Sequence, residues 1–168
     1  MLRKLYLLPV LAIFAIPAVA SAQFQAGNWE MTLSGSGSND QDFRTVDLSG
    51  NLSLGYFLTN AAELAVRQQI TYADAAGGGG SAWSGQTLAA FDWHFDLDRW
   101  QPFVGVNGGY SYGSSGISDA WIGGPEVGVK YFVNSTTFIQ AVASYEFNLQ
   151  EGIDDGGFLY GLGIGFKW

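Results

Sequence analysis

The residues with the most evident chemical potential are Asp92 and His94, which lie two positions apart around the only histidine of the chain. A histidine beside a carboxylate is a pair that can serve in acid–base catalysis or activate a hydroxyl nucleophile. No serine can be assigned to that role from the sequence, so a histidine held by hydrogen bonds in a polar interior is the favoured interpretation. The absence of cysteine excludes a disulfide framework and a thiolate metal site.

Two acidic runs and a glycine run offer little further chemistry. Residues 39–42 and 154–155 lack the spacing of a calcium loop, so at most they predict weak Ca²⁺ or Mg²⁺ contact. Gly77 to Gly80 is not followed by Lys-Ser or Lys-Thr, which excludes a phosphate-binding loop. These segments are interpreted as solvated loops.

Ten ionisable residues recur on the polar side of alternating segments, where they would share one interior. They are Glu30, Asp47, Glu63, Arg67, Asp92, His94, Glu126, Lys130, Glu146 and Lys167. Charges inside a narrow barrel are costly unless they are paired. We therefore predict a network in which Arg67, Lys130 and Lys167 bridge the acids, with Glu126 and Glu146 as the favoured partners.

The elements that must position these residues are strands, because apolar and polar residues alternate with a period of two. The clearest segment has Val46, Leu48, Leu52, Leu54 and Tyr56 on one side and only polar residues on the other. Eight such segments follow one another. They are expected near residues 28–34, 46–56, 63–72, 91–96, 101–112, 126–133, 139–147 and 158–168.

The apolar side of these strands is too bulky to face inward. An eight-stranded barrel has an interior just wide enough for side chains, whereas glycines and small polar residues crowd the opposite parity. The apolar side is therefore predicted to face lipid, and in lipid the strands must close into a barrel. No apolar run after the first twenty-two residues approaches the ~18 residues that a membrane-spanning helix needs.

The connections and the aromatic residues fit the same topology. Connections after the second, fourth and sixth strands are short, and the others are longer, as is typical of membrane barrels with short periplasmic turns. Aromatic residues recur at both ends of the strands, where they would form interfacial girdles. An even number of strands places both termini on the periplasmic side.

The chain begins with features of an export signal. Arg3 and Lys4 precede an apolar stretch, and Ala20-Ser21-Ala22 is a small-residue cleavage site. We predict a signal peptide at residues 1–22 and one barrel domain at residues 23–168; an uncleaved anchor is the alternative. The net charge of −8 argues against a nucleic-acid partner.

The last strand carries a family resemblance. The alternating stretch from Tyr160 to Trp168, with Leu162, Ile164 and Phe166, resembles the C-terminal signal of outer-membrane barrels, although those more often end in Phe. The stretches 101–110, 128–132 and 143–147 are similar to strands of small OmpA- or OmpX-like barrels. The resemblance spans the whole predicted mature chain and implies that the assembly machinery reads Tyr160, Leu162, Ile164, Phe166 and Trp168.

The resulting prediction is an all-β, eight-stranded, antiparallel up-and-down transmembrane barrel in the outer membrane. The first functional hypothesis is a non-enzymatic structural or surface-presenting barrel with a largely plugged lumen and no cofactor. The second is a narrow passive channel for ions or small solutes. A distant third is a lipid A-modifying enzyme, which the resemblance suggests for His94. Expected partners are outer-membrane lipid, lipopolysaccharide, and the assembly machinery and periplasmic chaperones of biogenesis; the ligand of the loops stays open.

Overall fold

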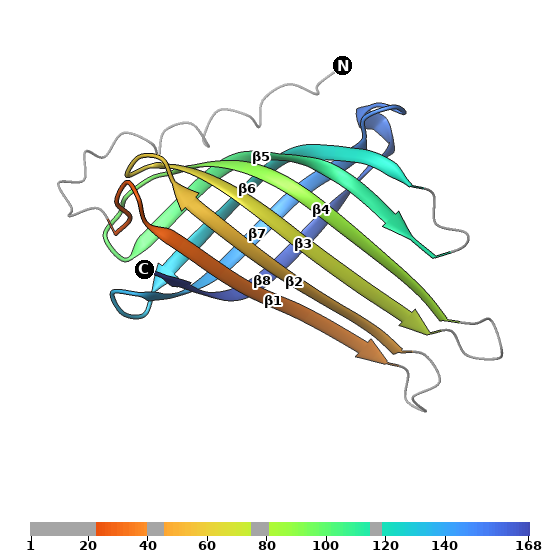
Figure 1. Cartoon of the computed structure of the whole chain (residues 1–168), viewed down its shortest axis with the longest axis horizontal. Coiled ribbons are helices and arrows are strands. Elements are labelled where there is room, and N and C mark those ends of the chain that lie inside the picture. Colours follow the sequence, from red (N-terminus) through yellow and green to blue (C-terminus); the bar gives the residue numbers. More distant parts are fainter. Residues whose placement is uncertain (1–22, 40–45, 75–80, 115–118) are drawn as a thin grey trace, which may run out of the picture.

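The computed structural model describes residues 23–39, 46–74, 81–114 and 119–168. Eight antiparallel strands follow one another around a closed barrel in chain order, and the last strand pairs with the first (Figure 1). The strands are β1 (Trp29–Asn39), β2 (Val46–Phe57), β3 (Ala62–Asp74), β4 (Ser81–His94), β5 (Trp100–Gly113), β6 (Ala120–Phe132), β7 (Thr137–Asn148) and β8 (Gly156–Lys167). A short 3-10 helix, η2 (Ile153–Asp155), precedes β8. The predicted eight-stranded meander is confirmed.

The two ends of the barrel differ. The turn end holds the three short connections 58–61, 95–99 and 133–136, the start of β1 and the C-terminus; the loop end holds the opposite ends of the strands and the connection 149–155 (Figure 1). Side-chain oxygens close the turns: Thr59 Oγ1 accepts from the Ala62 amide at 2.9 Å, and Asn134 Oδ1 accepts from the Thr137 amide at 2.8 Å. Among the described residues no helix is long and apolar enough to cross a membrane.

Three strands differ from the prediction by five residues or more at one end: β1, β4 and β6, the last of which begins at Ala120 rather than near Glu126. β4 begins at Ser81 and ends at His94, whereas the sequence placed its start near Phe91 and included Phe95. The alternation of residues did not predict the first half of β4, because there the polar Thr87 faces outward and the apolar Leu88 faces inward, opposite to the other strands. β1 continues to Asn39, although a loop was predicted from Gly35.

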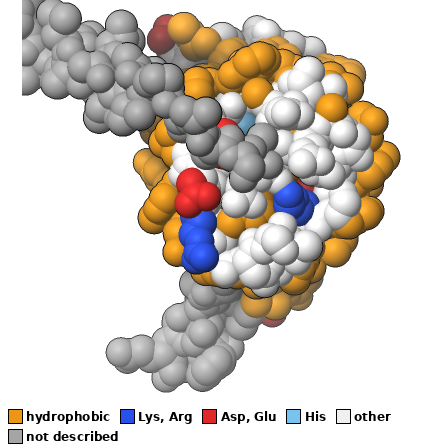
Figure 2. All heavy atoms as spheres, turned by 90° about the vertical axis from the view of Figure 1, so that its left-hand side faces the viewer, with side chains coloured by type: hydrophobic (Ala, Val, Ile, Leu, Met, Phe, Trp, Pro, Cys, Tyr) orange, Lys and Arg blue, Asp and Glu red, His pale blue; other side chains and the backbone are white. Residues whose placement is uncertain are grey.

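The outer surface is apolar on every strand. Leu54, Val66, Ile70 and Val127 have exposed fractions between 44% and 59%. Figure 2, which views the turn end, shows hydrophobic side chains around the perimeter of the barrel. An exposed apolar area of this extent fits lipid rather than water.

Aromatic residues pair across neighbouring strands at both ends of this surface. The ring centroids are 4.9 Å apart in Trp29–Tyr56, 4.7 Å in Trp100–Tyr131, 5.4 Å in Tyr110–Trp121 and 4.9 Å in Tyr145–Phe158. The first two pairs lie at the turn end and the last two at the loop end. They form the two aromatic bands expected where a barrel meets the membrane interfaces.

Glycines on the inner side give large side chains room to fold flat against the wall. A Cβ added to Gly165 would lie 2.1 Å from Phe138 Cζ, and one added to Gly128 would lie 2.4 Å from Phe103 Cζ. The carboxylate of Asp92 lies over Gly105 in the same way, at 1.9 Å from such a Cβ. The inner glycines are therefore the spaces into which the interior side chains fit.

We predict that Gly165→Val destabilises the barrel by about 1–3 kcal/mol, because its branched side chain would occupy the position of the Phe138 ring. The measurement is the urea midpoint of the refolded protein in lipid vesicles, read from the gel band that shifts on boiling. Gly157→Val is the matched control in the same strand, since an added Cβ there meets no atom within 4 Å. Equal midpoints for the two variants would contradict this account of the inner glycines.

Candidate functional site

A buried lysine organises the turn end of the interior. Lys130 in β6 is 1% exposed, and its ammonium donates to Glu30 Oε1 and Oε2 at 2.6 Å each and to Glu63 Oε2 at 3.0 Å. Glu30 lies in β1 and Glu63 in β3, so this one cation ties three strands together across the lumen. Both carboxylates are also buried, at 2% and 1% exposed.

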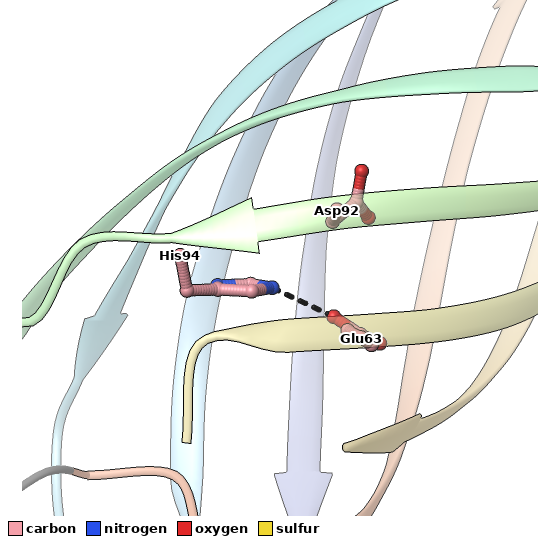
Figure 3. A group of neighbouring side chains, drawn as sticks. All are labelled: Glu63, Asp92 and His94. Atoms are coloured by element: carbon pink, nitrogen blue, oxygen red, sulfur yellow. Dashed lines mark hydrogen bonds and ion pairs between the residues drawn. The ribbon is translucent and has the colours of Figure 1, made fainter. Parts of the chain in front are cut away.

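The histidine completes this first layer. His94 Nε2 is 2.8 Å from Glu63 Oε2, and both side chains are buried (Figure 3). Because a carboxylate accepts, this contact requires the proton on Nε2 when the ring is neutral. Glu63 therefore joins His94 to Lys130 through a single oxygen.

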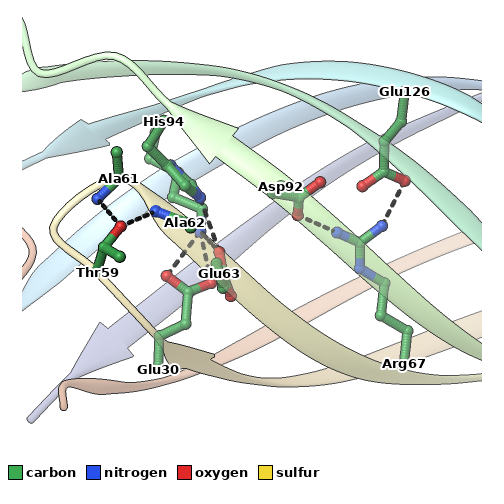
Figure 4. A network of polar contacts seen from close by, with 10 residues as sticks. Glu30, Thr59, Ala61, Ala62, Glu63, Arg67, Asp92, His94 and Glu126 are labelled. Carbon is green, nitrogen blue, oxygen red and sulfur yellow. Dashed lines mark hydrogen bonds and ion pairs between the residues drawn. The ribbon is translucent and has the colours of Figure 1, made fainter. Parts of the chain in front are cut away.

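A second ion-pair layer lies one step further from the turn end. Arg67 in β3 donates from Nη2 to Asp92 Oδ2 at 2.7 Å and from Nη1 to Glu126 Oε2 at 2.5 Å (Figure 4). Asn107 Nδ2 donates to the same Glu126 oxygen at 2.7 Å. Gly105 of β5 pairs with both Asp92 and Glu126, so a residue without a side chain separates the two acids that Arg67 bridges.

An aromatic layer lies between these ion pairs and the turn end. Phe24, Phe57, Phe132 and Phe138 form one cluster, each at most 1% exposed. The Phe24 ring stacks on Phe57 with centroids 4.0 Å apart. The Lys130 ammonium lies 5.1 Å from the Phe24 centroid and 5.3 Å from that of Phe138, at cation–π distance.

The segment before β1 delivers Phe24 into this layer. The Gly27 amide donates to the Phe57 carbonyl at 2.8 Å, and the Ala26 amide donates to Asn60 Oδ1 at 3.1 Å. Gly27 has φ of +91°, a conformation that favours glycine. The segment thus turns back under the barrel and is fixed to the β2–β3 turn.

The loop half of the interior is hollow. A cavity of about 770 Å³ is lined by small polar side chains such as Ser49, Asn51 and Ser53, and by Arg67 and Glu126 at its base. Gly161 and Gly163 of β8 line it on one side. The volume falls within the range of small-ligand pockets. We call this space the vestibule.

The structure brings seven of the ten predicted interior residues into two adjoining layers, and it places Glu146 and Lys167 elsewhere. The seven are Glu30, Glu63, Arg67, Asp92, His94, Glu126 and Lys130. Glu146 lines the vestibule instead, with Ser144 Oγ at 3.4 Å from its Oε1 and no bonding partner at Oε2. Lys167 donates to the Gln23 carbonyl and lies 5.7 Å from the Phe24 centroid, rather than bridging acids. The side chain of Asp47 lies outside the described residues.

The residues of the resemblance to C-terminal signals lie on the outer surface of β8. Tyr160, Leu162, Ile164, Phe166 and Trp168 are all exposed, and the first two are 79% and 71% exposed. Trp168 and Trp29 exchange two backbone hydrogen bonds of 3.0 Å, which join the C-terminus to β1. The predicted signal peptide lies outside the described residues.

The aromatic layer is the part of the interior that sequence reasoning missed. Three phenylalanines of this layer, and Phe103 beside it, lie on the same side of their strands as the polar residues, close to the short turns; the three are Phe57, Phe132 and Phe138. Apolar rings at such inward positions were the feature of the sequence that could have predicted the layer. Phe24 precedes the first strand, where periodicity gives no information.

The groups that could serve in catalysis or metal binding are partly engaged, although Asp92 Oδ1 and His94 Nδ1 have no hydrogen-bond partner among the described residues. Glu63, Asp92 and His94 offer three ligand atoms within 4.8 Å of one another. However, Glu63 Oε2 already contacts His94 and Lys130, and Asp92 Oδ2 contacts Arg67. Within the described part of the chain, no serine or threonine hydroxyl bonds to the His94 ring.

Solved structures share this architecture. The N-terminal β-barrel domain of Pseudomonas aeruginosa OprF is 20% identical, with a TM-score of 0.56, over 86% of this chain and 98% of that one. The outer membrane protein OprG from Pseudomonas aeruginosa is 14% identical, with a TM-score of 0.59, over 88% and 99%. Neisserial surface protein A is 17% identical, with a TM-score of 0.52, over 83% and 94%. The fold is that of a small outer-membrane β-barrel. Neither a protein-family model nor a curated protein matches the sequence.

We predict that Lys130→Met destabilises this barrel by about 3–5 kcal/mol, since it leaves Glu30 and Glu63 buried without their base. Adding Glu30→Gln should recover part of the loss, because one buried carboxylate is then neutral. Urea unfolding in lipid vesicles measures both effects as a double-mutant cycle. Arg99→Met, an exposed cation in the β4–β5 turn, is the control and should leave the midpoint near that of the parent protein.

Proposed function

We propose that the protein is a non-enzymatic, integral outer-membrane barrel with a structural or surface-presenting role and a lumen plugged at the turn end. The fold it shares with outer-membrane barrels and its apolar exterior support the membrane location. The interior supports the rest of the proposal, because the residues that could do chemistry there already bond to one another.

The observation that carries this proposal is the packed layer at the turn end. Phe24 fills the space between Phe57, Phe132 and Phe138, and the buried Lys130 group lies directly behind it. An ion that crossed the barrel would have to displace the rings and separate the ion pairs. The vestibule therefore has no polar path onward to the turn end through these residues.

The environment of His94 supports a role without catalysis. A lipid A-modifying enzyme needs a nucleophile beside its base, whereas the His94 ring contacts Glu63 and aromatic rings. The ring is 3% exposed and lies in the half of the barrel that holds the termini. Its geometry suits a structural hydrogen bond.

In this proposal the turn end and both termini face the periplasm. The predicted signal peptide delivers the chain, periplasmic chaperones escort it, and the assembly machinery reads the outer face of β8 from Tyr160 to Trp168. The loop end then meets lipopolysaccharide and the exterior, where the loops would present their surface.

Conductance in a planar bilayer tests the plug. We predict no discrete openings for the parent protein and discrete openings for Phe24→Ala, because that change removes the ring at the centre of the aromatic layer. Lys130→Ala should add to the effect or change ion selectivity. Phe91→Ala, which shortens a lipid-facing phenylalanine of β4, is the matched control and should stay silent.

Openings in the parent protein would favour the second hypothesis, a narrow passive channel. Silence in all variants, with folding verified by the heat-dependent gel shift, would show that Phe24 does not close the lumen.

Cysteine labelling tests the orientation, and the chain contains no native cysteine to interfere. Gln150→Cys lies at the loop end and Ser135→Cys lies in the β6–β7 turn, and both side chains are exposed. A membrane-impermeant maleimide on intact cells should label Gln150→Cys alone, and it should label both after the outer membrane is permeabilised. Labelling of Ser135→Cys alone on intact cells would reverse the proposed orientation.

A further inference from the structure

The β1–β8 seam is open at its loop end. The ladder runs from Glu30–Lys167 to Ser34–Gly163 and stops there, five pairs in all, whereas every other pair of neighbouring strands shares nine to thirteen. Beyond it, Gly35–Asn39 pairs only with β2, and Gly156–Leu162 pairs only with β7. Figure 1 shows β8 curving away from β1 toward η2.

The opening lies at a depth where the barrel faces lipid. With the Trp29–Trp168 hydrogen bonds added to the five ladder pairs, six residues of β1 are joined to the last strand. At a tilt of about 40° they span roughly 15 Å of barrel height, against an apolar band of about 25 Å. Phe158, Tyr160 and Leu162 of the open part of β8 are 69%, 79% and 71% exposed, as expected of lipid contacts. Backbone groups left unpaired at this depth need water or a ligand to bond to them.

The vestibule reaches both edges of the opening. Ser34 and Gly35 of β1 line the same cavity as Leu159, Gly161 and Leu162 of β8. There is space at Gly161, since only Val142 Cγ1, at 3.1 Å, comes within 4 Å of a Cβ added there. A molecule in the membrane can therefore enter the polar interior sideways without crossing the aromatic layer.

The base of the vestibule favours a cation. Glu126 lines this cavity and is 3% exposed; its Oε1 is buried without a bonding partner, while Oε2 takes the contacts from Arg67 and Asn107. Glu146 lines the cavity from β7 with a second unpartnered oxygen, Oε2. Glu126 pairs with Ser144 across the strands, which makes Glu146 its diagonal neighbour at about 7–8 Å. Among the described residues of the lining, Arg67 is the sole base, and two acids engage it.

From this geometry we propose a binding site for cationic amphiphiles, with an ammonium headgroup between Glu126 and Glu146 and an alkyl chain leaving through the β1–β8 opening into the membrane. A primary ammonium carries three donors for the unpartnered carboxylate oxygens. The chain stays in lipid contact beside Tyr160 and Leu162, so only the headgroup enters the polar interior. This site goes beyond the proposed structural role and lies on the loop side of the plug.

The test is calorimetric titration of dodecylammonium into the protein in phosphatidylcholine nanodiscs, with the heat from empty nanodiscs subtracted. We expect saturable one-to-one binding. Glu146→Gln should weaken it about tenfold by removing one charge without disturbing a described ion pair. Gly161→Phe should abolish the saturable component, because its ring would occupy the vestibule at the opening.

The controls separate this site from general adsorption to lipid. Gly157→Phe, in the same strand but outside the cavity lining, should bind like the parent protein. Dodecyl sulfate should show no saturable binding, and butylammonium should bind more weakly than dodecylammonium. The proposal fails if the parent protein shows no saturable component, if dodecyl sulfate binds equally, or if Glu146→Gln and Gly161→Phe both leave the affinity unchanged. Each variant is first verified as folded by its heat-dependent gel shift.

Discussion

The burial of the Lys130 ammonium is the constraint on which the interior depends. An ammonium that is 1% exposed needs a neutralising charge and acceptors for its hydrogen bonds. Glu30 of β1 and Glu63 of β3 supply both from across the lumen. Once those carboxylates are fixed, His94 can bond to Glu63, and the rings of Phe24 and Phe138 can approach the cation. The proposed plug is thus a single polar and aromatic unit rather than a set of separate contacts.

Such a unit fits inside eight strands only because glycines supply the space. The carboxylate of Glu63 lies over Gly55, that of Asp92 over Gly105, and the ring of Phe138 over Gly165. Each of these three side chains therefore lies over a glycine of a neighbouring strand. In the loop half, only Val142 Cγ1, at 3.1 Å, lies within 4 Å of a Cβ added to Gly161, and no ring or carboxylate lies over Gly161 or Gly163. Both glycines line the vestibule there.

The sequence predicts the wall of this barrel well and its interior contacts poorly, for a physical reason. Alternation of side chains fixes the face on which Arg67 and Lys130 lie, because it is a property of each strand alone. Lys130 finds Glu30 and Glu63 across the lumen, 100 and 67 residues away, which depends on closure and strand stagger. Glu126 and Glu146 share a face, yet only Glu126 lies within reach of Arg67. Phe24 belongs to no strand, so no periodicity marks it.

The local sequences of β1 and β8 account for the unpaired part of the seam between these two strands. Beyond Ser34, β1 reads Gly-Ser-Gly-Ser-Asn, residues with little preference for a strand and no bulk to hold a register. On the facing strand, Gly157, Gly161 and Gly163 leave Leu159 as the one inner side chain of β8 beyond the paired part. Pairing persists where Leu33 and Ile164 face each other and ends after Ser34 and Gly163, where β1 enters its Gly-Ser run. The β1–β8 ladder thus lies at the same end of the barrel as the aromatic layer and the Lys130 ion pairs, and the vestibule lies toward the end where the two strands are unpaired.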